Sequence, residues 1–439
     1  MDAKIRAQRG RGRGLLSGGG LLSGRGRSAG LMAALVFLVA LNLRPSVTAV
    51  GPLLPQIASD TGMDEGIQGL LGALPVLAFA LVSPLVHRAS HRLGPEPVVL
   101  GSLVVLAAGT LVRSWAGDAG LWVGTVLVGV AIAVGNVLVP ALVKRDYADT
   151  IAWATSLYST CLTVGSAVAA AAAVPLANAW GWRSSLAVWA LPAGLVALVW
   201  VPRTLHARPI PAAGRTWSDA KEEARASVWR SRTAWQVTLF MGLQSTAFYT
   251  LVTWLPTVQI AAGFSAETAG FHLFVFQLVG IPAGLLLPLL MRDPHSQVLA
   301  AVVASVPMVV GVLGLVLAPG AGLWWAVLTG LGAGPSLVMA MTLIGLRSRG
   351  PRETTRLSGM VQSVGYLLAA VGPVVFGQLA KVADGWQLPL SVLAVVAAAQ
   401  VVVAVFVGRV AQAPGGTSRL LLESGEAGSS LEEEPEDDA

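Results

Sequence analysis

The chain has 439 residues, of which 54% are hydrophobic and 12% are charged, and its mean hydropathy is positive. Soluble domains carry about twice that charged fraction, so the composition excludes an ordinary soluble domain and indicates a protein that crosses a membrane many times. The single cysteine, Cys161, excludes a disulfide framework and a cysteine-rich metal site.

Residues 1–30 are rich in Gly, Arg and Ser and show no helical period, so they are predicted to form a disordered basic tail. The tail directly precedes an apolar span, and basic residues in that position set the orientation of a membrane protein. We therefore expect no nucleic-acid partner. The apolar region that follows is too long for a signal peptide.

Twelve apolar stretches come next, and only helices satisfy the backbone of such stretches in lipid. They centre on residues 31–55, 66–86, 97–113, 121–143, 152–178, 184–202, 235–256, 268–290, 298–318, 322–345, 357–379 and 388–408. The predicted fold is an all-α membrane protein with two six-helix bundles, residues 31–202 and 235–408. A polar central loop, residues 203–234, joins the bundles, and residues 409–439 are predicted to form an acidic tail.

Basic residues gather on the side of the two tails. Apart from Arg44, only Arg113, Arg183 and Lys381 are predicted on the opposite side. This bias predicts that both termini are cytoplasmic. The length and the Gly/Ala/Val-rich composition suggest a bacterial inner-membrane protein.

The two halves repeat one pattern, in which Pro, Gly and Gly are spaced by seven residues. The repeated positions are Pro55, Gly62 and Gly69 in the first half and Pro256, Gly263 and Gly270 in the second. Such a repeat indicates a duplicated six-helix unit with pseudo-twofold symmetry. Duplicated bundles are typical of secondary transporters, whose substrate binds between the halves near the midplane.

Arg44 lies near the middle of the first span, where a guanidinium costs about 2.5 to 3.5 kcal/mol. All 23 Asp and Glu fall in tails, loops or span edges, so the sequence offers no midplane carboxylate as a partner. Small residues on the helix face of Arg44, with Pro45 and Pro52 beside it, favour a position that lines a cavity. We predict that Arg44 binds an anion; the alternative is that it bonds only carbonyls and amides and fixes helix packing.

Other side chains at similar depth are expected to complete the site, although a hydrogen bond between helices is an equally good explanation for each alone. The candidates are Gln244, Tyr249, Asn136 and Gln362, which rank first, and then Thr48, Tyr158, Phe248, Gln277 and Tyr366. His272 is the only histidine placed inside a span, and it is the candidate for coupling transport to protons. Its alternative role is a histidine that is hydrogen-bonded at the interface.

Several stretches resemble the major facilitator superfamily and, within it, the cyanate and nitroimidazole transporter family. The most specific are NLRPSVTAVGPLLPQI from residue 42 and FMGLQSTAFYTLVTWLP from residue 240; QSVGYLLAAVGP from residue 362 also matches. The superfamily's usual acidic position between spans two and three is occupied here by His91, in LVHRASHRLGPEP. The resemblance implies two bundles that rock around a central site, and it supports Gln244 and Tyr249 most directly.

The predicted function is secondary transport of a small anion, cyanate-like or organic, by alternating access. The alternative is export of a neutral drug-like solute such as a nitroimidazole. The spans contain no catalytic constellation and no phosphate-binding loop, so we expect neither an enzyme nor an ATP-driven pump. We expect no cofactor and no metal, and a functional monomer whose partners are the substrate and the lipid bilayer.

Overall fold

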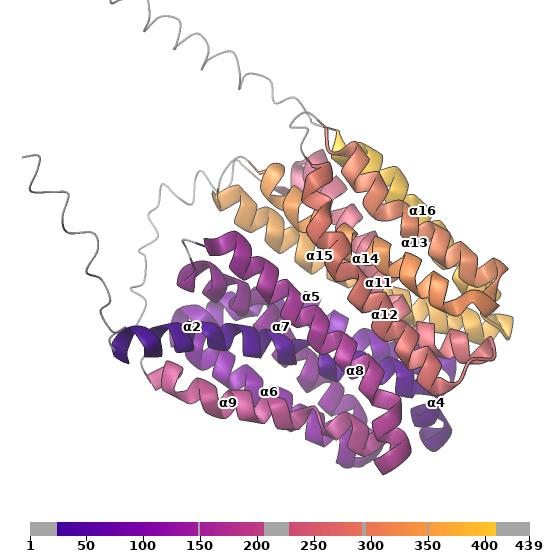
Figure 1. Ribbon diagram of the computed structural model, residues 1–439, viewed down its shortest axis with the longest axis horizontal. Helices are drawn as coiled ribbons and strands as arrows, with labels where there is room; N and C mark the ends of the chain where they lie inside the picture. The colour runs from indigo at the N-terminus through magenta and orange to yellow at the C-terminus, as the bar shows by residue number, and fades with distance from the viewer. Residues whose placement is uncertain (1–23, 148–149, 206–227, 292–295, 349–350, 410–439) are drawn as a thin grey trace, which may run out of the picture.

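The computed structural model describes residues 24–147, 150–205, 228–291, 296–348 and 351–409, which are mainly helical (Figure 1). Most of the predicted basic tail, most of the central loop and nearly all of the acidic tail lie outside the described residues. The first helix, α2, begins at Gly24 and therefore includes residues 24–30, which the sequence assigns to the tail.

The helices form two halves that lie side by side, coloured indigo to pink and salmon to yellow in Figure 1. The first half contains α2 (Gly24–Leu43), α3 (Pro45–Thr48), α4 (Val50–Thr61), α5 (Glu65–Leu93), α6 (Pro95–Trp115), α7 (Gly117–Asp146), α8 (Ile151–Ala187) and α9 (Ala190–Leu205). The second half contains η2 (Val228–Arg230), α11 (Arg232–Ala261), α12 (Ala266–Leu286), η3 (Leu287–Leu290), α13 (Val298–Leu317), η4 (Pro319–Ala321), α14 (Gly322–Leu346), α15 (Pro351–Ala383) and α16 (Gln387–Gly408).

Ten helical stretches in the described part of the chain are long and apolar enough to cross a membrane. One of them, Trp153–Leu205, has 53 residues and contains the non-helical Gly181, and it is long enough to cross twice. Helix α11 has 30 residues but is not among the ten. The count of twelve crossings needs both of these additions, so it stays a prediction.

The predicted repeat has a structural counterpart at the turns that follow α4 and α11. Gly62 has φ of 69° and Gly263 has φ of 97°, a left-handed backbone that favours glycine. The next helix begins in the same way in both halves. The side chain of Asp64 accepts the backbone N–H of Ile67 at 2.9 Å, and Ser265 accepts that of Thr268 at 3.2 Å.

The last glycine of each repeat lies where a helix of one half touches the other half. A Cβ added to Gly69 on α5 would come within 3.0 Å of the Pro373 carbonyl oxygen on α15. A Cβ added to Gly270 on α12 would lie 3.2 Å from the Ala170 carbonyl oxygen on α8. The repeated glycines thus allow close backbone contact across the boundary between the halves.

Two polar contacts join the halves near the same end of the molecule. Lys381 Nζ donates to Asp64 Oδ2 at 2.8 Å, and Asn178 Nδ2 donates to Glu267 Oε1 at 2.6 Å. With the glycine contacts, they hold the two halves together at the end where α4 meets α5. We call this end the closed end.

Acidic side chains near the opposite end pair within the first half. Arg145 contacts Glu96 at 2.6 Å and Asp146 at 2.9 Å, and Arg203 contacts Asp146. These residues lie at the ends of α6, α7 and α9. The pairs therefore fasten three helices of one half to one another and lie away from the middle of the spans.

Candidate functional site

The first span is broken at Arg44. Helix α2 ends at Leu43, Arg44 is the N-cap of the single turn α3, and α4 follows from Val50. Pro45 has no N–H, which removes the donor that would normally bond four residues back along the helix. Instead, the Arg44 carbonyl accepts the N–H groups of Val47 and Thr48, both at 3.0 Å. The proline beside Arg44 accounts for the break that positions the arginine.

Arg44 lines a small cavity between the two halves. The lining residues are Leu43, Arg44, Val47, Thr48, Phe79, Ile132, Asn136, Ser166, Phe248, Tyr249 and Val252. The guanidinium carbon lies 5.5 Å from the centre of the Phe248 ring, a cation–π distance. The cavity measures about 10 Å³ by where the centre of a water molecule fits, which is room for about one water.

Hydroxyl and amide groups connect the halves beside this cavity. Thr48 Oγ1 lies 2.6 Å from Ser166 Oγ, and Ser166 donates to Gln277 Oε1 on α12. Thr48, Asn136 and Gln277 are predicted site residues, and the structure brings the first two to the cavity wall and the third to Ser166. Sequence reasoning missed Ser166, because a serine in an alanine-rich span carries no signal of its own.

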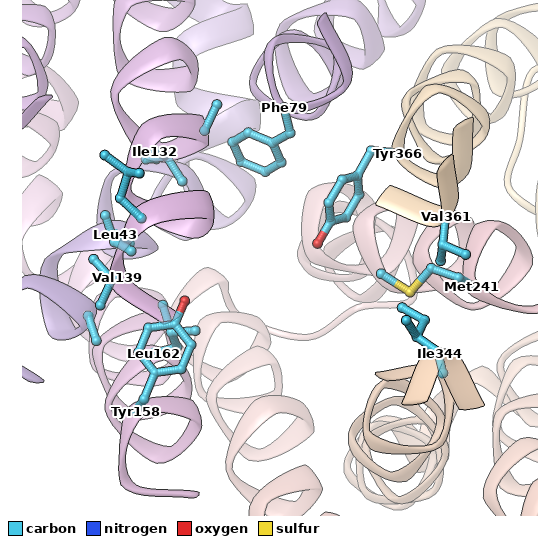
Figure 2. Close-up of a cluster of buried hydrophobic side chains, with 14 of the residues drawn as sticks. Leu43, Phe79, Ile132, Val139, Tyr158, Leu162, Met241, Ile344, Val361 and Tyr366 are labelled. Atoms are coloured by element: carbon cyan, nitrogen blue, oxygen red, sulfur yellow. The ribbon is translucent and has the colours of Figure 1, made fainter. Parts of the chain in front are cut away.

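Aromatic rings from both halves meet near Arg44. Phe79 packs edge-on against Tyr249 at 6.3 Å and against Tyr366 at 5.7 Å between ring centres. Figure 2 shows Phe79 and Tyr366 facing one another from opposite halves, with Tyr158 on the side of the first half. Tyr158 is buried and lies within range of the Arg44 charge. Phe79 was not predicted, because a phenylalanine in an apolar span is typical of any core.

Two of the residues ranked first do not line the cavity in the described structure. Gln244 is buried against α14, where its amide nitrogen lies 3.5 Å from the Ala333 carbonyl oxygen. Its oxygen accepts the hydroxyl of Ser245 at 3.1 Å. The amide of Gln362 donates to Ser358 on the same helix at 3.0 Å. Gln244 therefore forms the hydrogen bond between helices that is the alternative explanation for such residues, whereas Gln362 bonds only within its own helix.

His272 is buried near the start of α12. Its Nδ1 lies 2.6 Å from Gln259 Oε1, while the Gln259 amide nitrogen donates to the Gly322 carbonyl at 3.1 Å. Since the amide nitrogen is directed at Gly322, the oxygen faces the ring, and Nδ1 carries the hydrogen of the neutral imidazole. The proton-accepting nitrogen is then Nε2. His272 is not among the residues that line the Arg44 cavity.

Arg113 is buried as well, although the sequence places it among the basic residues on the side opposite the tails. Its side chain is 1% exposed, and Nη1 donates to the Ser46 carbonyl at 2.6 Å. Nε and Nη2 have no hydrogen-bond partner in the described structure. Gly124 on α7 packs against the backbone and Cβ of Arg113, so α6 and α7 lie in close contact at this position. Arg113 thus holds the backbone next to the break at Arg44.

Carboxylates are absent from the cavity wall in the part of the chain that the structure describes. The ion pairs found there involve Arg145, Arg183, Arg203 and Lys381, and none involves Arg44. Within the described ranges, no group of three His, Cys, Asp or Glu is arranged to hold a metal ion. The site therefore combines a guanidinium with neutral hydrogen-bonding groups and aromatic rings.

The fold and this central cavity between two helical halves define the class of secondary transporters. Residues 32–373 match the family model described as Major Facilitator Superfamily, and the chain belongs to this superfamily. The predicted family and transporter class are therefore confirmed.

Three known proteins illustrate the relationship. The chain is 36% identical to the 2-nitroimidazole transporter of Escherichia coli (strain K12), over 88% of this chain and 97% of that protein. It is 28% identical to the cyanate transport protein CynX of the same organism, over 81% of this chain and 92% of that protein. A solved structure of a bacterial homologue of the human lysosomal transporter Spinster superposes with a TM-score of 0.72 at 17% identity. It covers 88% of this chain and 99% of that one, and the likeness shows the fold.

Proposed function

We propose that the chain carries a small anion across the bacterial inner membrane by alternating access, with Arg44 as the central binding charge. The observation that carries this proposal is the position of Arg44 in a cavity lined by both halves, with no carboxylate within ion-pair distance among the described residues. Arg44 is half-buried, and a guanidinium at this depth in a span without a carboxylate partner favours a negatively charged ligand. An ion pair at 4 Å is worth about 4 kcal/mol before desolvation at an effective dielectric constant of about 20.

The other groups around the cavity suit the same ligand. Asn136 offers an amide donor to an anion, whereas Thr48 and Ser166 would have to exchange their present hydrogen bonds for bonds to the ligand. The cavity has room for about one water in this conformation, so it must widen for any cargo, and it must widen less for a cargo of few atoms. The name of the CynX relative, a cyanate transport protein, agrees with such a cargo.

Two observations favour the alternative, a neutral heteroaromatic cargo. The relative with 36% identity is named a 2-nitroimidazole transporter. Phe79, Phe248, Tyr249 and Tyr366 lie close to one another near Arg44, and rings of this kind stack on planar aromatic solutes. This cargo is larger than the cavity in this conformation, so these rings would have to move apart to admit it.

Uptake by purified protein in lipid vesicles separates the two cargoes. We expect Arg44→Gln to lower cyanate uptake about ten- to a hundredfold, the value of a lost charge-assisted hydrogen bond, and Arg44→Lys to lower it less. Arg92→Gln, which removes an exposed arginine, is the matched control and should transport normally. Uptake of 2-nitroimidazole that survives Arg44→Gln, without cyanate uptake by the unmodified protein, would instead establish the neutral cargo.

Proton coupling through His272, cytoplasmic termini and a functional monomer belong to the same proposal. His272 keeps Nε2 available as a proton acceptor while Nδ1 bonds Gln259. His272→Gln should abolish the dependence of uptake on a pH gradient. A gradient dependence that persists in this variant would remove His272 from the coupling mechanism.

A further inference from the structure

A groove lies on the second half at the beginning of α11 and the end of α16, and it shares no lining residue with the Arg44 cavity. Trp229, Arg230, Arg232, Trp235, Gln236 and Phe406 line it, and it measures about 610 Å³ by where the centre of a water molecule fits. We call it the α11/α16 groove. Helices α11 and α16 pack against each other, so the groove is formed by two neighbouring spans.

The aromatic wall of the groove is held in place by its own contacts. The indole nitrogen of Trp235 donates to the Trp229 carbonyl at 2.9 Å, and the two rings meet edge to face at 6.1 Å. These contacts fix the short turn η2 against the first turn of α11. Even so, Trp229 and Trp235 remain 55% and 45% exposed, so their faces are available to another molecule.

Three arginines surround the mouth of the groove. Arg230 and Arg232 line it, and the guanidinium of Arg409 lies 5.7 Å from the centre of the Phe406 ring, which also lines it. No ion pair between any of these arginines and a carboxylate is found within the described ranges. The mouth therefore carries a concentrated positive charge directly beside exposed aromatic rings.

The groove continues as an apolar surface along both helices. Leu239 lies one turn after Trp235 on α11, and Val402 lies one turn before Phe406 on α16. Leu239 and Val402 are both exposed, as is Phe406. The pattern on each helix leads from the charged mouth toward the middle of the span. Such a surface has a polar end and an apolar length, as a phospholipid does.

We infer that the α11/α16 groove is a binding site for an anionic phospholipid. Arg230, Arg232 and Arg409 would bind the headgroup phosphate, and Trp229 and Trp235 would lie at headgroup depth, where indoles are enriched. An acyl chain would cover Leu239 and Val402. A zwitterionic lipid brings an ammonium group to the same three arginines and is disfavoured by repulsion.

The acidic end of the chain, residues 432–438, is the other source of negative charge for this groove. Its residues are Glu, Asp and one Pro, which offer nothing to the apolar surface beyond the mouth. The lipid uses both parts of the groove, and the acidic segment uses only the first. The combination of charge with the apolar surface therefore favours the lipid.

Native mass spectrometry of the full chain in detergent tests this site, with phosphatidylglycerol and phosphatidylcholine as the two probes. The unmodified protein should retain one phosphatidylglycerol more strongly than phosphatidylcholine. Replacing Arg230, Arg232 and Arg409 by Gln should weaken the retention of phosphatidylglycerol about fivefold for each arginine removed. The matched control, Arg88→Gln with Arg92→Gln and Lys144→Gln, removes three exposed basic residues from the other half and should retain the lipid unchanged.

Three results would overturn the inference. The first is equal retention of the two lipids by the unmodified protein. The second is an unchanged preference in the triple variant. The melting temperature of this variant should equal that of the control, so that misfolding does not explain weaker retention. The third is retention of phosphatidylglycerol only after the chain is shortened to end at Ala411, which would assign the groove to the acidic segment.

Discussion

Closure of the two halves at the closed end depends on glycine at position 69. An alanine there places a methyl group within 3.0 Å of the Pro373 carbonyl oxygen, 3.1 Å from its carbonyl carbon and 3.2 Å from the Val374 Cα. All three are backbone atoms, so no flexible side chain can move aside. The Pro373 carbonyl also accepts the Trp254 indole at 3.0 Å, which holds it in place. Helices α5 and α15 must therefore separate.

Overpacking of this kind costs about 1 to 3 kcal/mol, and in this protein the cost applies only while the closed end is closed. Gly69→Ala should consequently shift the equilibrium between closed and open forms about 5- to 150-fold toward the open form. The gain in helix propensity, about 1 kcal/mol, is present in both forms and cancels. Gly359→Ala on α15 is the matched control, since Gly359 is exposed with nothing within 4 Å of an added Cβ.

Spin labels at Ala119 and Gly320, in a Cys161→Ala background, report the separation of the halves at this end. Both positions are exposed, the first in α7 and the second in η4. Pulsed electron–electron double resonance should show a larger population of long distances in Gly69→Ala than in the control. Identical distance distributions in the two variants would refute the argument that backbone contact at Gly69 limits the closed form.

Three further predictions concern the contacts around this boundary. The Lys381 ammonium and the Ile67 N–H lower the pKa of Asp64 from its usual value of 3.8. The contact between Lys381 and Asp64 is therefore present above the lowered pKa and is lost as the pH falls through it. The same spin labels should therefore show no change between about pH 8 and about pH 5, and Asp64→Asn should favour the open form throughout this range. A transition near neutral pH would contradict this. Ser166→Ala should weaken the link to Gln277 and shift the same equilibrium by about 0.5 to 1.5 kcal/mol, measured by the same distances. An unchanged distance distribution would contradict this and show that the link is equally strong in both forms. Gly263→Ala should lower the thermal stability by about 1 to 2 kcal/mol, because φ of 97° strains a residue with a Cβ, and an unchanged melting temperature would show that the turn relaxes without cost.

The sequence by itself determined the class of the protein and predicted several residues of the candidate site. Long apolar stretches can satisfy their backbone in lipid only as helices, so hydropathy predicts the spans without knowledge of packing. A duplicated pattern of glycines predicts equivalent positions, and Gly62 and Gly263 indeed share a left-handed backbone. The cost of a charge in hydrocarbon made Arg44 conspicuous, because it depends on depth in the span and not on the neighbours.

Only the tertiary structure decided which polar groups meet. Gln244 and Ser166 are similar in sequence, as polar residues in apolar spans, yet Gln244 faces α14 and Ser166 joins Thr48 to Gln277. Arg113 falls at the end of a predicted span, but its side chain turns inward to the Ser46 carbonyl. The direction of a side chain depends on the rotation of its helix and on the small residues opposite it, and both are set by packing between helices. A hydropathy pattern predicts the depth of a residue along the membrane normal but not the rotation of its helix about the helix axis. The position of a side chain in a binding site depends on both.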